Sequence, residues 1–254
     1  MARSCFMVEC DHKTMHRSGP SKFQTTSWSL VLTAGHDPAV DSRPALARLC
    51  ETYWNPVFAF IRRSGYDRDQ AQDLTQGFFA LLVEKNFLEV ADPQRGRFRS
   101  FLLTAVKGFL SNERDRLHAM KRGGGETHVS IDVNADALYA PVGAESDTPE
   151  SLFERRWALS LLEHAMAKLR AEFSAVGRDR QFETLSPFIN RESMGTRYEE
   201  VATELGVSAG ALRTVVHRMR RRYRELLRAE IAETVASPED IDEEIRFLMS
   251  VLSS

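Results

Sequence analysis

The sequence predicts an all-α fold of two helical domains joined by a flexible linker, and three observations lead to this prediction. Apolar residues recur at helical spacing in several long segments, and no segment shows the alternation typical of a half-buried strand. Gly and Pro residues separate these segments. The length of 254 residues suits two small domains better than one large one.

The first predicted domain comprises residues 27–122 and follows a flexible extension over residues 1–26. Three helices are expected in it, each opened by a residue that can cap a helix or by the first residue of an apolar pattern. Their expected first residues are Asp41 or Ser42, Asp67 or Asp69, and Phe98. The run of three glycines from Gly123 ends the third helix.

Residues 123–150 form the predicted linker, because they are rich in Gly, Asp and Ala and their hydrophobic spacing is irregular. The second domain comprises residues 151–236, with helices expected near 149–173, 181–189, 198–205 and 208–235. Residues 237–254 are acidic, and their apolar residues recur at i, i+4, i+7, i+8 and i+11. We therefore expect an amphipathic C-terminal helix that docks on the protein itself. Two roles are open for it: it screens the basic segment 209–228, whose charge its own negative charge complements, or it only extends the core of the second domain.

The net charge of −2 conceals two basic segments and one acidic segment. Residues 93–122 contain eight basic and two acidic residues, and residues 209–228 contain seven Arg and one Glu, so each segment has a net charge of +6. Residues 229–254 contain seven acidic residues and one Arg. Two separate basic helices indicate a polyanion contacted twice, although each is also compatible with a solvated helix face.

The segment from Tyr198 to Arg218 has the pattern of a helix-turn-helix. Ala202 is small where a second helix crosses closely, and Gly206 can adopt the left-handed conformation that the tight turn requires. Ser208 is placed to cap the second helix. The first turns of such a helix meet base edges, and later Arg residues hold phosphates. The alternative is an ordinary helical hairpin with a basic, solvated face.

Three blocks resemble the sigma-70 family in its two-domain, extracytoplasmic-function (ECF) form. YDRDQAQDLTQGFF from Tyr66 resembles the polymerase-binding helix, FRSFLLTAVKGFLSNER from Phe98 the promoter-melting helix, and Tyr198 to Arg228 the helix-turn-helix. The resemblance covers roughly residues 45–122 and 152–235. Several residues depart from the family pattern: Gln70, Gln72, Phe101, Gly108, Asn112 and Val215.

The resemblance implies an alternative sigma factor that binds core RNA polymerase and directs promoter-specific initiation. The first domain would bind the clamp helices of the largest subunit and open the −10 element, and the second would read the −35 element beside the flap of the second-largest subunit. It implies polymerase contacts by Asp73, Gln76 and Phe79. The implied −10 contacts are Arg95, Arg97, Phe98, Arg99, Lys107, Asn112 and Arg116. Phe98 or Phe101 would supply the aromatic ring that stacks on unpaired bases, and the alternative for these rings is plain core packing. The implied −35 contacts are Ser208, Ala211, Arg213, Thr214, His217, Arg218 and Arg221.

Thr75 is a candidate phosphorylation site for a Ser/Thr kinase. Gln70 and Gln72 replace acids that the family usually has, and a phosphate would restore about −1.5 to −2 charge. The alternative is that Thr75 merely fills a helix position. An anti-sigma factor is a further candidate partner.

We expect no enzymatic activity and no cofactor, because the chemistry would belong to the polymerase. The three cysteines have no disulfide spacing and no membrane segment is visible, so we expect a cytoplasmic protein. Two other functions remain open: a helix-turn-helix regulator that never joins polymerase, and a helical metal-dependent hydrolase, for which no cluster of ligands is apparent. A set of four residues has zinc-ligand chemistry but no common zinc-site spacing: Cys5, Cys10, His12 and His16.

Overall fold

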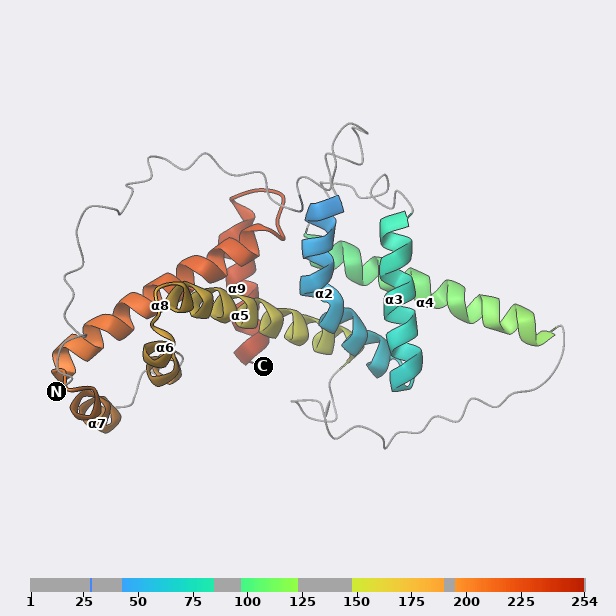
Figure 1. The fold of residues 1–254 in the computed structure, drawn as a ribbon. Helices are drawn as coiled ribbons and strands as arrows, with labels where there is room; N and C mark the ends of the chain where they lie inside the picture. The colour runs from blue at the N-terminus through green and yellow to red at the C-terminus, as the bar shows by residue number, and fades with distance from the viewer. Residues whose placement is uncertain (1–27, 29–42, 85–96, 123–147, 190–194, 254) are drawn as a thin grey trace.

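The computed structural model describes residues 28, 43–84, 97–122, 148–189 and 195–253, and all regular structure within them is helical. The all-α fold class is therefore confirmed. The elements are α2 (Arg43–Arg63), α3 (Arg68–Glu84), α4 (Phe98–Arg122), α5 (Pro149–Ala175), α6 (Asp179–Leu185), the 3-10 helix η4 (Ser186–Phe188), α7 (Gly195–Leu205), α8 (Ala209–Ala232) and α9 (Asp240–Ser253) (Figure 1). The segment 181–189, expected to be one short helix, divides into α6 and η4 where Pro187 follows Ser186.

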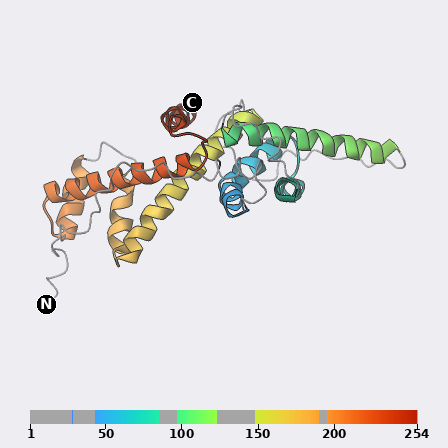
Figure 2. The same cartoon turned by 90° about the horizontal axis from the view of Figure 1, so that it is seen from above.

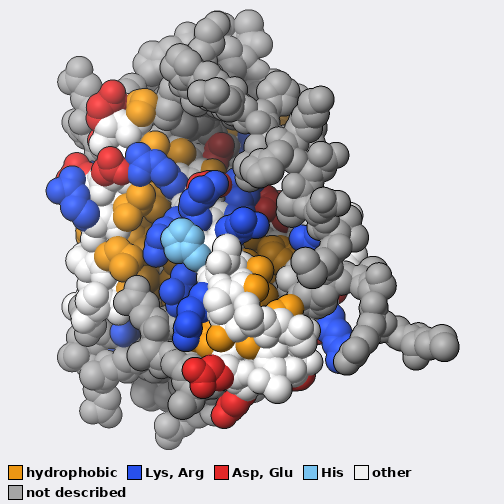
Figure 3. All heavy atoms as spheres, turned by 90° about the vertical axis from the view of Figure 1, so that its left-hand side faces the viewer, with side chains coloured by type: hydrophobic (Ala, Val, Ile, Leu, Met, Phe, Trp, Pro, Cys, Tyr) orange, Lys and Arg blue, Asp and Glu red, His pale blue; other side chains and the backbone are white. Residues whose placement is uncertain are grey.

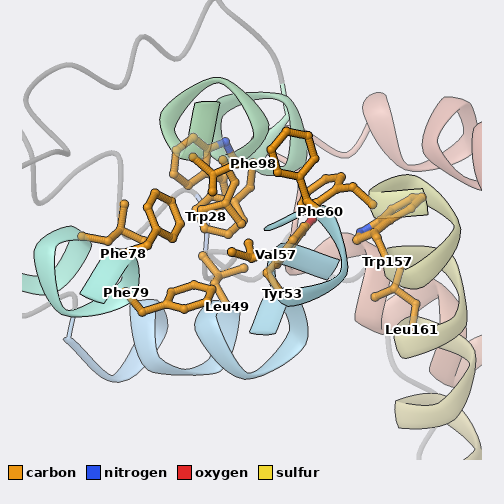
Figure 4. Close-up of a cluster of buried hydrophobic side chains, with 14 of the residues drawn as sticks. Trp28, Leu49, Tyr53, Val57, Phe60, Phe78, Phe79, Phe98, Trp157 and Leu161 are labelled. Atoms are coloured by element: carbon orange, nitrogen blue, oxygen red, sulfur yellow. The ribbon is translucent and has the colours of Figure 1, made fainter. Parts of the chain in front are cut away.

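A first hydrophobic core lies among α2, α3 and α4 and contains several aromatic side chains (Figure 4). Trp28, Tyr53 and Phe98 are buried together in it, with the Phe98 ring 4.9 Å from each of the other two ring centroids. The same core includes Phe153 and Trp157 from the first half of α5. Residues from both predicted domains thus share one core. Two domains joined only by a flexible linker would not be expected to share a core.

A second core is formed by the second half of α5, α6, η4, α7 and the part of α8 up to Leu226. Helices α5 and α8 run side by side and contribute to both cores (Figures 1 and 2). The Tyr223 hydroxyl of α8 donates a hydrogen bond of 3.3 Å to the Leu162 carbonyl of α5. This pair of long helices therefore links the two ends of the molecule.

Helix α9 carries the acidic C-terminal sequence and packs on both α5 and α8. Its buried face contains Ile241 and Leu248, with Ile245 and Leu252 partly buried beside them. Glu244 lies between these apolar residues and is also fully buried. Helix α9 is thus part of the first core, although it is the last helix in the sequence.

Candidate DNA-binding surfaces

The turn between α7 and α8 has the geometry that its sequence predicts. Gly206 has a φ of +66°, in the left-handed region that favours glycine. The Val207 N–H donates to the Ala202 carbonyl at 2.9 Å, and this bond closes the C-terminus of α7. The Ser208 hydroxyl accepts a hydrogen bond of 3.2 Å from the Ala211 N–H and caps α8.

The packing of α7 against α8 decides which side chains of α8 face solvent. Tyr198 and Ala202 of α7 and Leu212 and Val216 of α8 are buried in the second core. The predicted −35 contacts lie outside this packed face and are all exposed: Ser208, Ala211, Arg213, Thr214, His217, Arg218 and Arg221. The structure therefore brings the seven residues together along one exposed side of a capped helix.

The arginines of α8 differ in whether they already form hydrogen bonds or ion pairs with other parts of the protein. The Arg220 guanidinium donates to the Phe188 carbonyl at 2.8 and 3.1 Å, and Arg222 pairs with Glu172 at 2.6 Å. Within the described part of the chain, Arg218 forms no ion pair, and Arg213 only lies over the Tyr198 ring at 5.8 Å. Arg221 pairs with Glu225 on the same helix at 3.3 Å, so Arg213 and Arg218 are the predicted contacts among these arginines that remain available to a ligand.

Figure 3 views the molecule from the end where α6, α7 and α8 lie. Lys and Arg side chains gather along the middle of this face, with a His among them and acidic side chains toward its margins (Figure 3). The basic band itself is the kind of charge distribution that attracts a polyanion.

At the start of α4 the structure corrects the role of Phe98. The ring is completely buried between Trp28 and Tyr53, so it cannot stack on an unpaired base in this conformation. Phe101 is only partly buried, and its ring lies 5.6 Å from the Trp28 ring. The prediction that Phe98 is an exposed −10 contact is therefore wrong, because the first core takes this side chain.

Arg97 and Arg99, also predicted −10 contacts, are held by acidic residues from other helices. The Glu244 carboxylate lies 2.8 Å from Arg97 Nε and 2.7 Å from Arg99 Nε. Glu243 pairs with Arg97 at 2.7 Å, and Glu154 of α5 lies 3.6 Å from Arg99. Both arginines are therefore occupied in this conformation and are not presented to DNA.

The other predicted −10 contacts lie further along α4. Lys107, Asn112 and Arg116 are exposed; Lys107 pairs with Glu150 at 2.7 Å, and Arg116 with Glu113 at 2.8 Å. The Lys107 ammonium also lowers the pKa of the Glu150 carboxyl by donating a hydrogen bond to it. Arg95 lies outside the described residues.

On α3, two of the three predicted polymerase contacts are accessible. Asp73 and Gln76 are exposed, but Phe79 is only 6% exposed and stacks on the Trp54 ring at 5.5 Å. The prediction of Phe79 as a surface contact is wrong, because α2 covers its ring. Trp54 and Val83, which the sequence reasoning did not select, are the exposed apolar residues beside it. The apolar residues of α2 that recur at helical spacing leave Trp54 off the apolar face, and that position was the available signal: Leu46, Leu49, Cys50, Tyr53, Val57, Phe60 and Ile61.

Thr75 lies on the buried side of α3 and is completely buried. Its hydroxyl donates a hydrogen bond of 2.6 Å to the Ala71 carbonyl one turn earlier. A kinase would reach this hydroxyl only after local unfolding of α3. The structure therefore contradicts the prediction of Thr75 as a phosphorylation site.

Glu244 is the site residue that the sequence reasoning missed, since it entered only as part of a net charge. It follows Ile241 by three residues and precedes Leu248 by four, which places it on the apolar stripe of α9. An acidic residue that is buried with an apolar stripe needs a charged partner. The position of Glu244 on that stripe was therefore the sequence signal that could have identified it.

The described residues contain no group of three His, Cys, Asp or Glu side chains that could hold a metal ion. The four candidate zinc ligands near the N-terminus lie outside those residues. No described helix is both long enough and apolar enough to cross a membrane.

Comparison with known proteins supports the resemblance seen in the motifs. The chain is 26% identical over 197 residues to the ECF RNA polymerase sigma factor SigE of Mycolicibacterium smegmatis. The similarity covers 76% of this chain and 66% of that protein, so the chain spans just under two thirds of the relative's length. No protein-family model and no solved structure matches the chain. The chain is therefore similar to an ECF sigma factor over about three quarters of its length.

Proposed function

We propose that this protein is an alternative sigma factor of the ECF type, which binds core RNA polymerase and directs transcription initiation at specific promoters. The observation that carries the proposal is the capped, basic and exposed start of α8 after a glycine turn. The similarity to an ECF sigma factor over 76% of the chain supports the same function. The protein acts in the cytoplasm on promoter DNA, without a cofactor or a catalytic activity of its own.

In this proposal the two basic surfaces have separate tasks. The exposed side of α8 reads the −35 element, with Arg213, Thr214, His217 and Arg218 near the bases and Arg221 near the phosphates. The exposed residues of α4, Lys107, Asn112 and Arg116, track the phosphates of the opened −10 element.

Core polymerase binds the surface of α3 that contains Asp73 and Gln76, through the clamp helices of the largest subunit. The exposed Trp54 and Val83 lie beside Phe79 and supply apolar contact area there. The flap of the second-largest subunit contacts the region of α7 and α8.

Binding of purified core polymerase to the full chain tests the proposal. We expect wild type to co-elute with core polymerase in size-exclusion chromatography, and Asp73→Arg to bind at least about tenfold more weakly because an interface charge is reversed. Glu163→Arg is the matched control, since Glu163 is an exposed acid on α5, away from α3. A protein that binds duplex DNA but never core polymerase would instead be a stand-alone regulator, and the proposal would be wrong.

A further inference from the structure

The Glu244 carboxylate lies between two arginines that precede and follow Phe98. One oxygen is 2.7 Å from Arg99 Nε and the other is 2.8 Å from Arg97 Nε, while the Glu244 side chain has no exposed surface. Charge-assisted bonds of this length are among the strongest in proteins, and a buried carboxylate depends on them for its stability. The C-terminal helix α9 is thus bound to the start of α4 through two ion pairs of one buried carboxylate.

Aromatic rings cover the rest of the Arg99 guanidinium. It lies 3.7 Å from the centre of the Phe247 ring of α9 and 5.5 Å from the Trp157 ring of α5. The Arg99 side chain is only 11% exposed and that of Arg97 18%. Little surface of either arginine therefore remains for a phosphate group.

Two further contacts hold this arrangement. The Phe98 N–H at the start of α4 donates to the Thr234 carbonyl, just after α8, at 3.4 Å. Asp242 of α9 forms an ion pair with Arg228 of α8. The acids of α9 therefore neutralise arginines from both basic segments of the sequence, two from the first and one from the second.

We propose that α9 is an intramolecular lock, and that the described conformation is the closed form of the protein. In the closed form Glu243 and Glu244 occupy Arg97 and Arg99, which nucleic acid phosphates would otherwise bind. Binding of core polymerase releases α9 and returns both arginines to the promoter-melting surface of α4. This inference rests on the proposed function, because it names the regulation of the same DNA-binding surface.

The apolar side of α9 explains why polymerase is the releasing partner. Release exposes Ile241, Leu248 and Phe247, as well as Trp157 beneath them. DNA phosphates can replace the acidic side chains at the arginines, but they cannot bury the apolar side chains that release of α9 exposes. A protein partner can bury them. Free DNA therefore binds the closed form weakly.

Glu244→Gln tests the lock in the free protein, because it removes the charge that holds both arginines with little change in shape. Glu239→Gln is the matched control: Glu239 is an exposed acid of the same segment, and its loss changes the net charge equally. The probe is a short fluorescein-labelled single-stranded oligodeoxynucleotide of mixed sequence, followed by fluorescence anisotropy.

If the closed form makes up about nine tenths of the free protein, opening it raises the apparent affinity about tenfold. We expect this gain for Glu244→Gln and a change of less than about twofold for Glu239→Gln, which alters only the general charge. Equal affinities of the two variants, with circular dichroism like that of wild type, would overturn the lock.

Hydrogen exchange on wild type provides a second measurement that needs no variant. We expect amides of α9 to be protected in the free protein and to lose protection when core polymerase is bound. Bound protein in which α9 stays protected would overturn the lock while leaving the proposed function intact. Failure to bind core polymerase at all would contradict the proposed function, and the oligonucleotide comparison would still decide the lock.

Discussion

The start of α4 and the start of α8 have the same type of sequence but different surroundings. Each lies in a segment with a net charge of +6, yet Arg97 and Arg99 are enclosed by acids and rings, while Arg213 and Arg218 are exposed. Counting charges along the chain therefore identifies both helices as basic. It does not distinguish an arginine that is exposed to solvent from one that is already paired with acidic side chains. The distinction depends on α9, whose Glu244 pairs with Arg97 and Arg99 at the start of α4, whereas its ion pair with α8 is at Arg228, near the end of that helix.

The largest expected effect separates core packing from base stacking at the start of α4. Phe98→Ala should lower the free energy of unfolding by about 3–5 kcal/mol, because it empties a fully buried aromatic site. Leu117→Ala on the same helix is the control, since Leu117 is 47% exposed and should change stability by less than about 0.5 kcal/mol. Urea denaturation measures both. Unchanged stability with weaker single-strand binding would return Phe98 to the DNA-binding surface.

At the start of α8 we expect binding, rather than stability, to change. Arg213→Ala and Arg218→Ala should each cost roughly 1–3 kcal/mol in affinity or base discrimination for a duplex that contains the −35 element. Their melting temperatures should stay at the wild-type value, because both side chains are exposed. Arg170→Ala removes an exposed arginine of α5 and serves as the control in the same titration. Identical affinity and sequence preference in all three variants would contradict the placement of the recognition surface.

The smallest effect concerns the helix pair that joins the two regions. His164 of α5 lies 3.7 Å from Glu230 of α8, and its interaction with this carboxylate raises the pKa of the imidazole above 6.5. Burial raises the pKa of Glu230, but hydrogen bonds from His164 and Lys168 outweigh it, so the Glu230 pKa is lowered overall. Glu230 therefore stays ionised while His164 titrates.

The protonated His164 stabilises the fold, so its contribution is complete below about pH 6.5 and is lost as pH rises through the raised pKa. Wild type should show a small decline in stability over this range. Partial exposure of the imidazole to solvent limits its size. In His164→Gln the decline should be reduced, as thermal melts across this pH range would reveal. Parallel pH profiles for the two proteins would contradict a role for this pair.

Local chemistry explains why the α7–α8 turn was predictable from the sequence. Gly206 supplies the left-handed turn and Ser208 caps α8, and both roles involve only residues a few positions away in the sequence. Such short-range interactions are set by residue type and spacing. The Arg99–Glu244 pair joins residues separated by 145 positions, and no local pattern identifies such a partner. The apolar stripe of α9 predicted an amphipathic helix, but not the helix start against which it packs.

On α3 the helical period carried more information than the family motif. Thr75 follows Ala71 by four residues and precedes Phe78 by three, so spacing alone places it on the buried face. Its position inside a resembling motif suggested an accessible hydroxyl instead. Phe79 was misplaced for the same reason, because motif position does not report the exposure of a side chain.

The sharing of α5 and α8 between the two cores has a consequence for how the chain folds. A fragment that ends at residue 122 contains α2, α3 and α4 but lacks Phe153, Trp157 and Leu248, which complete the first core. Such a fragment leaves an aromatic surface open to water and is prone to self-association during synthesis, before the rest of the chain arrives. Once both long helices are in place, loss of either core removes support from the other, so we expect the folded chain to melt as one cooperative unit.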